Sequence, residues 1–145
     1  MKILIVYKSY HLMNTEKVAR AMAEATNATL AKVDEVRPED IATYDLVGFG
    51  SGIYGGRHHK ELFALVGQMP SMEKPAFVFS TSGSGKEAYH RPLKEALTAK
   101  GCHIRGEFQC KGEVRFLRFI RTNRGHPDEK DLEDARTFAR GLITA

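Results

Sequence analysis

The chain alternates between short apolar runs and segments with helical periodicity, and this alternation restricts its fold more than any other feature. The runs Ile3–Tyr7, Leu46–Gly50 and Pro75–Phe79 are short and rich in β-branched and aromatic residues, as expected for strands buried on both faces. Weaker strand patterns at Ala28–Val33 and His103–Cys110 are typical of sheet edges. The sequence therefore predicts an α/β fold.

Right-handed crossovers between such strands give one five-stranded parallel sheet with helices on both faces. A length of 145 residues suits a single domain, residues 1–145, with a sizeable core. No apolar run approaches the roughly 20 residues of a transmembrane segment, and the start is too short for a signal peptide. Cys102 and Cys110 have neither metal-ligand nor redox-pair spacing. We expect a reduced, cytoplasmic protein that is a monomer.

Three strands of the predicted sheet end in loops of small polar residues. The first loop, residues 9–15, leads into a helix whose N-terminal N–H groups and positive dipole end favour an anion such as phosphate. A simpler interpretation is that Asn14 only caps this helix. Loops 51–56 and 80–85 follow the third and fourth strands, and the pattern from His58 to Val66 predicts a short helix after the first of these two loops. Ligands of open α/β sheets bind outside the carboxyl ends of the strands, so the three loops predict a site for a phosphorylated ligand.

The chain resembles the short-chain flavodoxins and their flavodoxin-like relatives along essentially its whole length. Residues 9–15, Ser-Tyr-His-Leu-Met-Asn-Thr, are similar to a variant of that family's phosphate loop, with Met13 in place of a glycine. If this position needs positive φ, methionine adopts it at a cost of about 1 kcal/mol or more. Residues 50–56 and 80–85, with Tyr89 beyond, resemble the two loops that contact the isoalloxazine, and residues 125–132 resemble the lead-in to the last helix.

The resemblance implies a three-layer sandwich with strand order 2-1-3-4-5, bound FMN and electron transfer. It implies that Tyr54, or else Tyr89, stacks on the isoalloxazine, while glycines expose backbone groups to its polar edges. The residues that match the cofactor loops are Ser9, His11, Met13, Asn14, Thr15, Ser51, Gly52, Ile53, Tyr54, Gly55, Gly56, Thr81, Ser82, Gly83, Ser84, Gly85 and Tyr89.

Four histidines lie in or beside these loops and raise the question of a metal site. They are His11, His58, His59 and His90, and no carboxylate or cysteine lies at ligand spacing with them. We therefore expect no metal. His11 is a candidate contact to the phosphate or ribityl chain, with a solvent-facing loop histidine as the alternative.

The positive charge of the chain is concentrated in one segment. Residues 111–126 hold five basic residues against Glu113, which equals the whole net charge of +4. The simplest interpretation is a loop or short helix with solvated arginines over apolar core residues. The functional alternatives are docking to an acidic redox partner and peripheral contact with an anionic membrane; we expect no nucleic acid. The arginines concerned are Arg115, Arg118, Arg121 and Arg124.

Three functions remain open. The first is a one-electron carrier between redox proteins, without catalytic residues of its own, because no candidate general acid or base lies in a predicted pocket. The second is a flavin-dependent oxidoreductase such as a flavodoxin-like protoporphyrinogen oxidase or a quinone reductase. Residues 56–60, Gly-Arg-His-His-Lys, and the arginine segment resemble features of those oxidases. The third is a regulatory module that kept the fold and lost the cofactor, favoured only by Met13.

Overall fold

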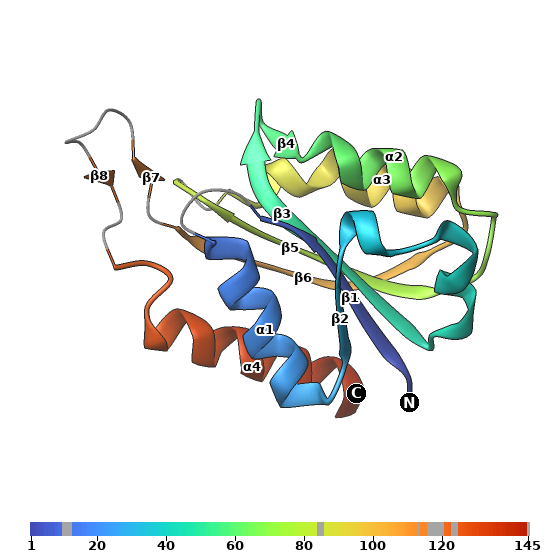
Figure 1. The fold of residues 1–145 in the computed structure, drawn as a ribbon, viewed down its shortest axis with the longest axis horizontal. Coiled ribbons are helices and arrows are strands. Elements are labelled where there is room, and N and C mark those ends of the chain that lie inside the picture. The colour runs from blue at the N-terminus through green and yellow to red at the C-terminus, as the bar shows by residue number, and fades with distance from the viewer. Residues whose placement is uncertain (10–12, 84–85, 113, 116–120, 123–124, 145) are drawn as a thin grey trace.

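The computed structural model describes residues 1–9, 13–83, 86–112, 114–115, 121–122 and 125–144, the two short segments by their backbone (Figure 1). Its main sheet contains parallel strands in the order β2-β1-β3-β5-β6. The predicted fourth and fifth strands are labelled β5 and β6, because a short additional strand, β4, precedes them. The order therefore confirms the predicted α/β class and strand order, and the two weak strands lie at the edges. The strands are β1 (Ile3–Lys8), β2 (Thr29–Lys32), β3 (Leu46–Tyr54), β5 (Pro75–Ser82) and β6 (His103–Lys111).

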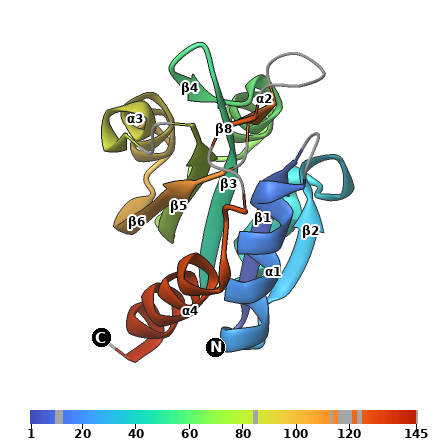
Figure 2. The same ribbon diagram turned by 90° about the vertical axis from the view of Figure 1, so that its left-hand side faces the viewer.

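Helices cover both faces of this sheet (Figure 2). Helices α2 and α3 pack on one face, and α1 and α4 pack on the other. Each face has its own buried cluster of apolar side chains, so the molecule has three layers. The α-helices of the described residues are α1 (Asn14–Thr26), α2 (Lys60–Gln68), α3 (Arg91–Ala99) and α4 (Glu129–Thr144).

The strand β1 shows why the apolar runs are continuous. Its alternate residues Ile3, Ile5 and Tyr7 pack toward α1 and α4, whereas Leu4 and Val6 pack toward α2 and α3. All five are buried. Because successive side chains of a strand point to opposite faces, a strand covered on both faces must be apolar at every position.

Two glycines of β3 make room for aromatic side chains of the neighbouring strand. A Cβ atom at Gly48 would lie 2.2 Å from the ring of Phe77, and one at Gly50 would lie 2.2 Å from the ring of Phe79. The two phenylalanine rings stack with their centroids 6.2 Å apart. The glycines are therefore required by packing of the sheet face under α1 and α4.

A β-hairpin follows the third strand, where the sequence predicted a loop followed by a helix. The strand β3 continues to Tyr54, turns at Gly55 and Gly56, and pairs antiparallel with β4 (Arg57–His58). Both glycines have positive φ, 61° and 80°, as a two-residue type I′ hairpin requires. The sheet thus gains a sixth, antiparallel strand, and α2 starts at Lys60 rather than at His58.

The later part of the chain also differs in two places. The strand β5 runs on to Ser82, so the predicted loop residues 80–82 are strand residues. Strands β7 (Val114–Arg115) and β8 (Arg121–Thr122) form an antiparallel hairpin where we expected a loop or short helix. Arg115 and Arg121 are paired in it, while Arg118 and Arg124 lie outside the described residues. Within the part of the chain that is described, no helix is long and apolar enough to cross a membrane.

Candidate functional site

The strand register brings the three polar strand ends to one edge of the sheet. Lys8 of β1 pairs with Ser51 of β3, which pairs in turn with Ser80 of β5. One residue further on, Gly52 pairs with Thr81. The strand ends that the sequence predicted to form a site therefore lie side by side, at the end of the sheet where α1 begins (Figure 1).

The first of these ends is shaped by backbone conformation. Met13 precedes α1 in the left-handed region, with φ 58° and ψ 32°, and makes no side-chain cap. The helix itself begins at Asn14, so the interpretation of Asn14 as its N-cap is wrong. Lys17 N–H makes a backbone bond to Met13 O (3.1 Å), and Glu16 N–H donates to Ser9 Oγ (3.2 Å). Positive φ at Met13 confirms that methionine occupies a position suited to glycine.

A buried hydroxyl pair joins the start of α1 to the end of β5. The Oγ1 atoms of Thr15 and Thr81 are 2.8 Å apart, and either can donate. Both residues are buried, and 66 positions separate them in the sequence. The contact fixes the N-terminus of α1 against the sheet edge, which holds two of the predicted site residues together.

A carboxylate also lies close to the N-terminus of α1. Glu16 accepts a hydrogen bond from the Tyr7 hydroxyl (2.6 Å) and has Arg20 at 3.9 Å. Burial, followed by the bond to Glu16, raises the pKa of Tyr7 to about 12. Tyr7 therefore remains a hydrogen-bond donor that holds Glu16 at neutral pH.

The β3–β4 turn presents an exposed aromatic ring at the site. Tyr54 is 40% exposed and lies edge-on to His59, with ring centroids 5.2 Å apart. Its hydroxyl oxygen would be 3.0 Å from a Cβ atom at Gly52, so the ring folds back over that glycine. Ile53 pairs with His58 across the hairpin. Tyr54 thus has an accessible aromatic surface next to a turn without side chains.

Ser51, another predicted cofactor contact, has its hydroxyl engaged within the protein. Its Oγ donates to Gly52 O (2.6 Å) and accepts from His59 N–H (2.9 Å). The side chain is buried. Ser51 therefore ties β3 to the start of α2.

Two buried histidines that were not among the predicted cofactor contacts, His58 and His90, lie against β5 next to the site. His58 Nε2 is 2.9 Å from Phe79 O, and His90 Nε2 is 2.6 Å from Ser80 Oγ. Burial lowers the pKa of His58 to about 4, and burial also lowers the pKa of His90. Both are neutral at pH 7, which makes them hydrogen-bonding groups within the protein.

Gly112, which follows β6, connects the end of β5 with the start of α1. It was not among the predicted site residues. Gly112 N–H donates to Ser82 O (3.1 Å), and a Cβ atom at Gly112 would lie 2.7 Å from Asn14 Nδ2. Gly83 is exposed, and Tyr89 is half-buried in the 3-10 helix η3 (Glu87–His90). The predicted contacts His11, Ser84 and Gly85 lie outside the described residues.

A cavity of about 350 Å³ adjoins the turn on the side of α2. The Arg57 guanidinium lies over the Phe63 ring at 4.0 Å from its centroid. Aromatic rings and cationic side chains thus meet at this cavity. Its lining residues are Tyr54, Arg57, His58, His59, Lys60 and Phe63.

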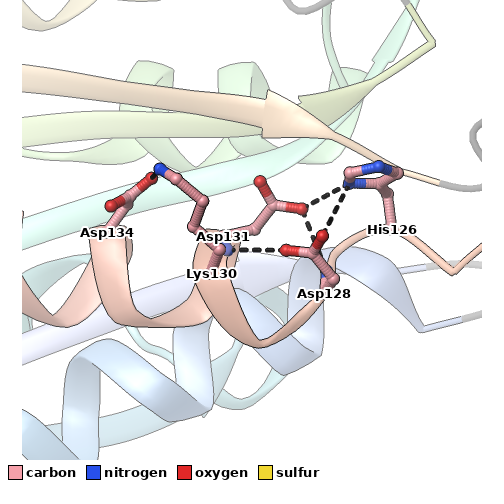
Figure 3. Close-up of polar contacts among 5 residues, drawn as sticks. All are labelled: His126, Asp128, Lys130, Asp131 and Asp134. Carbon is pink, nitrogen blue, oxygen red and sulfur yellow. Dashed lines mark hydrogen bonds and ion pairs between the residues drawn. The ribbon is translucent and has the colours of Figure 1, made fainter.

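The start of α4 brings together three groups that are able to bind a metal ion (Figure 3). His126 Nδ1 is 2.6 Å from Asp131 Oδ2. Asp128 N–H donates to the Asp131 carboxylate, and Asp131 N–H donates to the Asp128 carboxylate, each at 2.9 Å. This reciprocal pattern is a capping box at the helix N-terminus, so the cluster has a structural explanation.

Comparison with known proteins gives consistent matches. Residues 4–125 match a family model described as a flavodoxin domain. An uncharacterized protein of Methanocaldococcus jannaschii is 44% identical over 148 residues, covering 99% of each chain. The structure of oxidised flavodoxin 2 from Bacillus cereus superposes with a TM-score of 0.77 at 20% identity, covering 99% of each chain. A flavoprotein of Lactobacillus acidophilus NCFM, solved in complex with FMN, covers 74% of this chain and 92% of its own, with a TM-score of 0.59 at 17% identity.

Proposed function

The chain belongs to the flavodoxin domain family, and from this we propose that it binds FMN at the ends of β1, β3 and β5 and carries single electrons between redox proteins. The observation that carries the proposal is the register of these three strands. It places their polar ends at one edge of the sheet, beside the N-terminus of α1. Such an edge is where open α/β sheets bind their ligands.

The residues present at this edge suit the two parts of FMN. The N-terminal N–H groups and dipole of α1, with Ser9 and Thr15 beside them, suit a phosphate dianion. The exposed ring of Tyr54 suits contact with a flat apolar ring system. No described atom other than chain neighbours lies within 4 Å of a Cβ built at Gly55 or Gly56, which leaves the turn open to close approach. When bound, FMN supplies the redox chemistry, and the protein supplies binding, orientation and electrostatics.

An absorbance spectrum of the purified protein tests this function most directly. We expect bound flavin, or its uptake when FMN is added to apoprotein, and reductive titration that resolves one-electron steps. Riboflavin, which lacks the phosphate, is the matched control ligand and should bind more weakly. A protein that stays colourless with excess FMN would rule out the proposal and favour the cofactor-free module.

The cavity beside Tyr54 favours a second candidate, a flavin-dependent oxidoreductase. Arg57 and Lys60 give it positive charge, and Tyr54 and Phe63 give it aromatic surface, so an anionic aromatic substrate would suit it. Turnover of a quinone or of protoporphyrinogen by the FMN-loaded protein, weakened in Arg57→Ala, would favour this enzyme. Reduction and oxidation only through protein partners would favour the carrier.

For the carrier, we propose that the partner is an acidic redox protein that docks at the segment with Arg115, Arg118, Arg121 and Arg124. The hairpin β7–β8 lies at the same end of the sheet as the predicted FMN site (Figure 1). Charge reversal at Arg115 and Arg121 should slow electron transfer at low salt and have less effect at high salt, because surface charges are screened. Equal rates would contradict this docking surface.

We also propose a cytoplasmic location. Cys102 and Cys110 are both buried and not disulfide-bonded, which suits a reducing compartment. Localisation of a tagged chain would test this.

A further inference from the structure

Two segments that would contact the isoalloxazine are each attached to β5 by a histidine. The first is the β3–β4 turn, residues 54–57, and His58 follows it directly. The second is residues 86–90, which contain Tyr89 and end in His90. His58 bonds to the carbonyl of Phe79 and His90 bonds to the hydroxyl of Ser80, so the two attachments occupy consecutive residues of one strand.

The partners of each ring fix which of its nitrogens carries the proton. Phe79 O can only accept, so His58 Nε2 donates and its Nδ1 carries no hydrogen. His90 Nδ1 is 3.1 Å from Glu107 Oε1 and donates to this carboxylate, which leaves His90 Nε2 to accept from Ser80 Oγ–H. Glu107 Oε2 accepts in turn from Lys94 Nζ at 2.5 Å. A continuous hydrogen-bonded chain thus runs from β5 through η3 to β6 and α3.

The two imidazoles also contact one another. Their centroids are 5.0 Å apart and their planes are tilted by 45°. His58 is 1% exposed and His90 is 0% exposed. Within the described residues His58 Nδ1 has no hydrogen-bond partner, so the hydrogen bond to Phe79 O is the attachment that holds this ring. The two segments therefore meet at a buried contact between the two rings.

We propose that His58 and His90 are positioning residues for the flavin: together they fix the β3–β4 turn and residues 86–90 relative to one another before FMN binds. This inference rests on the FMN binding proposed above. A binding segment that is already fixed needs no ordering when the ligand binds, so preorganisation increases affinity. Loss of either attachment should then weaken FMN binding without removing any group that touches FMN.

Fluorescence titration of apoprotein with FMN tests the proposal in matched variants. His58→Leu removes the donor to Phe79 O, whereas His58→Gln can keep an N–H near the position of Nε2. We expect His58→Leu to weaken FMN binding by about tenfold or more, as loss of a buried hydrogen bond predicts, and His58→Gln to restore much of the affinity. Ser80→Ala, which removes the Ser80 hydroxyl donor to His90, should weaken binding by a smaller factor. The midpoint potential of the bound flavin should shift in the same order.

Leu97→Ala is the control for general destabilisation, because Leu97 is a fully buried apolar residue of α3, whereas the hydrogen bonds described for His58 and His90 involve Phe79, Ser80 and Glu107. It should lower stability and leave FMN affinity near wild type. If Leu97→Ala weakens FMN binding as much as His58→Leu, or if His58→Gln gives no rescue, the positioning role is overturned. If His58→Leu does not fold, the FMN affinities of Ser80→Ala and Leu97→Ala are compared instead. An affinity loss in Ser80→Ala no larger than that in Leu97→Ala would then overturn the positioning role.

A double variant tests whether the histidines act as one unit. If the pair fixes one relative position, His58→Leu with Ser80→Ala should weaken FMN binding by less than the product of the single effects. Independent, multiplying effects would show two separate attachments and overturn the pair. A wild-type protein that does not take up FMN would refute the proposed function, whereas a wild type that binds FMN with unaffected variants would refute only this inference.

Discussion

The two ends of the proposed FMN site are built in different ways. The phosphate end, residues 13–15 with Thr81, is shaped by backbone conformation and by a hydroxyl pair. The ring end, residues 54–58 and 86–90, is attached to β5 by buried imidazoles. Hydroxyls and backbone groups do not titrate near neutral pH, whereas imidazoles do.

Because of this difference, the two ends of the site should respond differently to acid. At the phosphate end, a change of pH leaves the contacts of the protein unchanged. At the ring end, protonation of His58 would place a proton on a buried Nδ1 that has no acceptor among the described residues. The ring end should therefore be the part of the site that acid disrupts first.

The largest expected effect is on the acid unfolding of a His58→Gln variant compared with wild type. The pKa of His58 falls from 6.5 to about 4 through burial, with the bond to Phe79 O and the charge of Glu107 opposing the shift and His90 adding to it. The unfolded chain therefore binds more protons than the folded one between these values. The contribution of His58 is fully present above pH 6.5 and is lost as pH falls toward 4, by about 3 kcal/mol in the free energy of unfolding.

Urea unfolding followed by circular dichroism across this range measures the effect. Wild type should lose stability more steeply with falling pH than His58→Gln, because glutamine does not titrate. His90, with Glu107, Lys94 and Glu87 around it, contributes in the same direction in both proteins, since its pKa is also lowered by burial. Equal slopes in the two proteins would show that His58 is not a buried neutral base.

Thr81→Val sharpens the comparison from the phosphate end. The substitution leaves the buried Thr15 hydroxyl without this partner, which should destabilise the protein by about 1–2 kcal/mol. The loss should be the same at neutral and at mildly acidic pH, because neither hydroxyl titrates. The Thr15→Val/Thr81→Val double variant should lose less than the sum of the singles. A loss that grows in acid would break the distinction between the two ends.

The start of α1 was predictable from the sequence, whereas the Thr15–Thr81 contact and the attachment of the ring end were not. Residues 9–15 lie between a strand pattern and a helical pattern, so local pattern was enough to expect a helix start there, and the family resemblance marked Met13 as unusual. The hydrogen bond of His58 reaches Phe79, 21 positions away, and that of His90 reaches Ser80, 10 positions away. Both partners are residues of β5. Such contacts depend on the register of β5 against its neighbours, which a single sequence does not contain.

The β3–β4 hairpin lies between these two cases, because the sequence contains a pattern that indicates a hairpin turn. Two glycines between segments able to form strands indicate a two-residue hairpin turn, and Tyr54 and Arg57 are paired across it. The same residues also suit a glycine-rich cofactor loop followed by a helix, and that interpretation places His58 at the start of the helix. Recognition of the turn would have placed His58 on a strand, facing the interior.

Met13→Gly tests whether the phosphate end stores backbone strain. Met13 is 41% exposed and has φ 58°, so glycine removes the steric cost of the left-handed region at little cost in packing. We expect a gain of about 0.5–1 kcal/mol in the free energy of unfolding, after the entropy lost by glycine is taken into account. Asn27→Gly is the matched control, because Asn27 has φ 56° but asparagine tolerates this region. A gain no larger than that of Asn27→Gly would mean that Met13 is not strained.

The smallest effect concerns an ion pair between the strand that precedes the phosphate end and the helix that follows the β3–β4 hairpin. Lys8, at the end of β1, and Glu61, in the first turn of α2, lie 2.9 Å apart between Nζ and Oε2. The bond to Lys8 lowers the pKa of Glu61, but its side chain is 38% exposed and therefore screened. Glu61→Gln should cost at most about 0.5 kcal/mol at low salt and almost nothing at high salt. Glu95→Gln on the exposed surface of α3 is the control. A larger, salt-independent loss for Glu61→Gln alone would show that the two ends are mechanically coupled, and that acid disruption of one extends to the other.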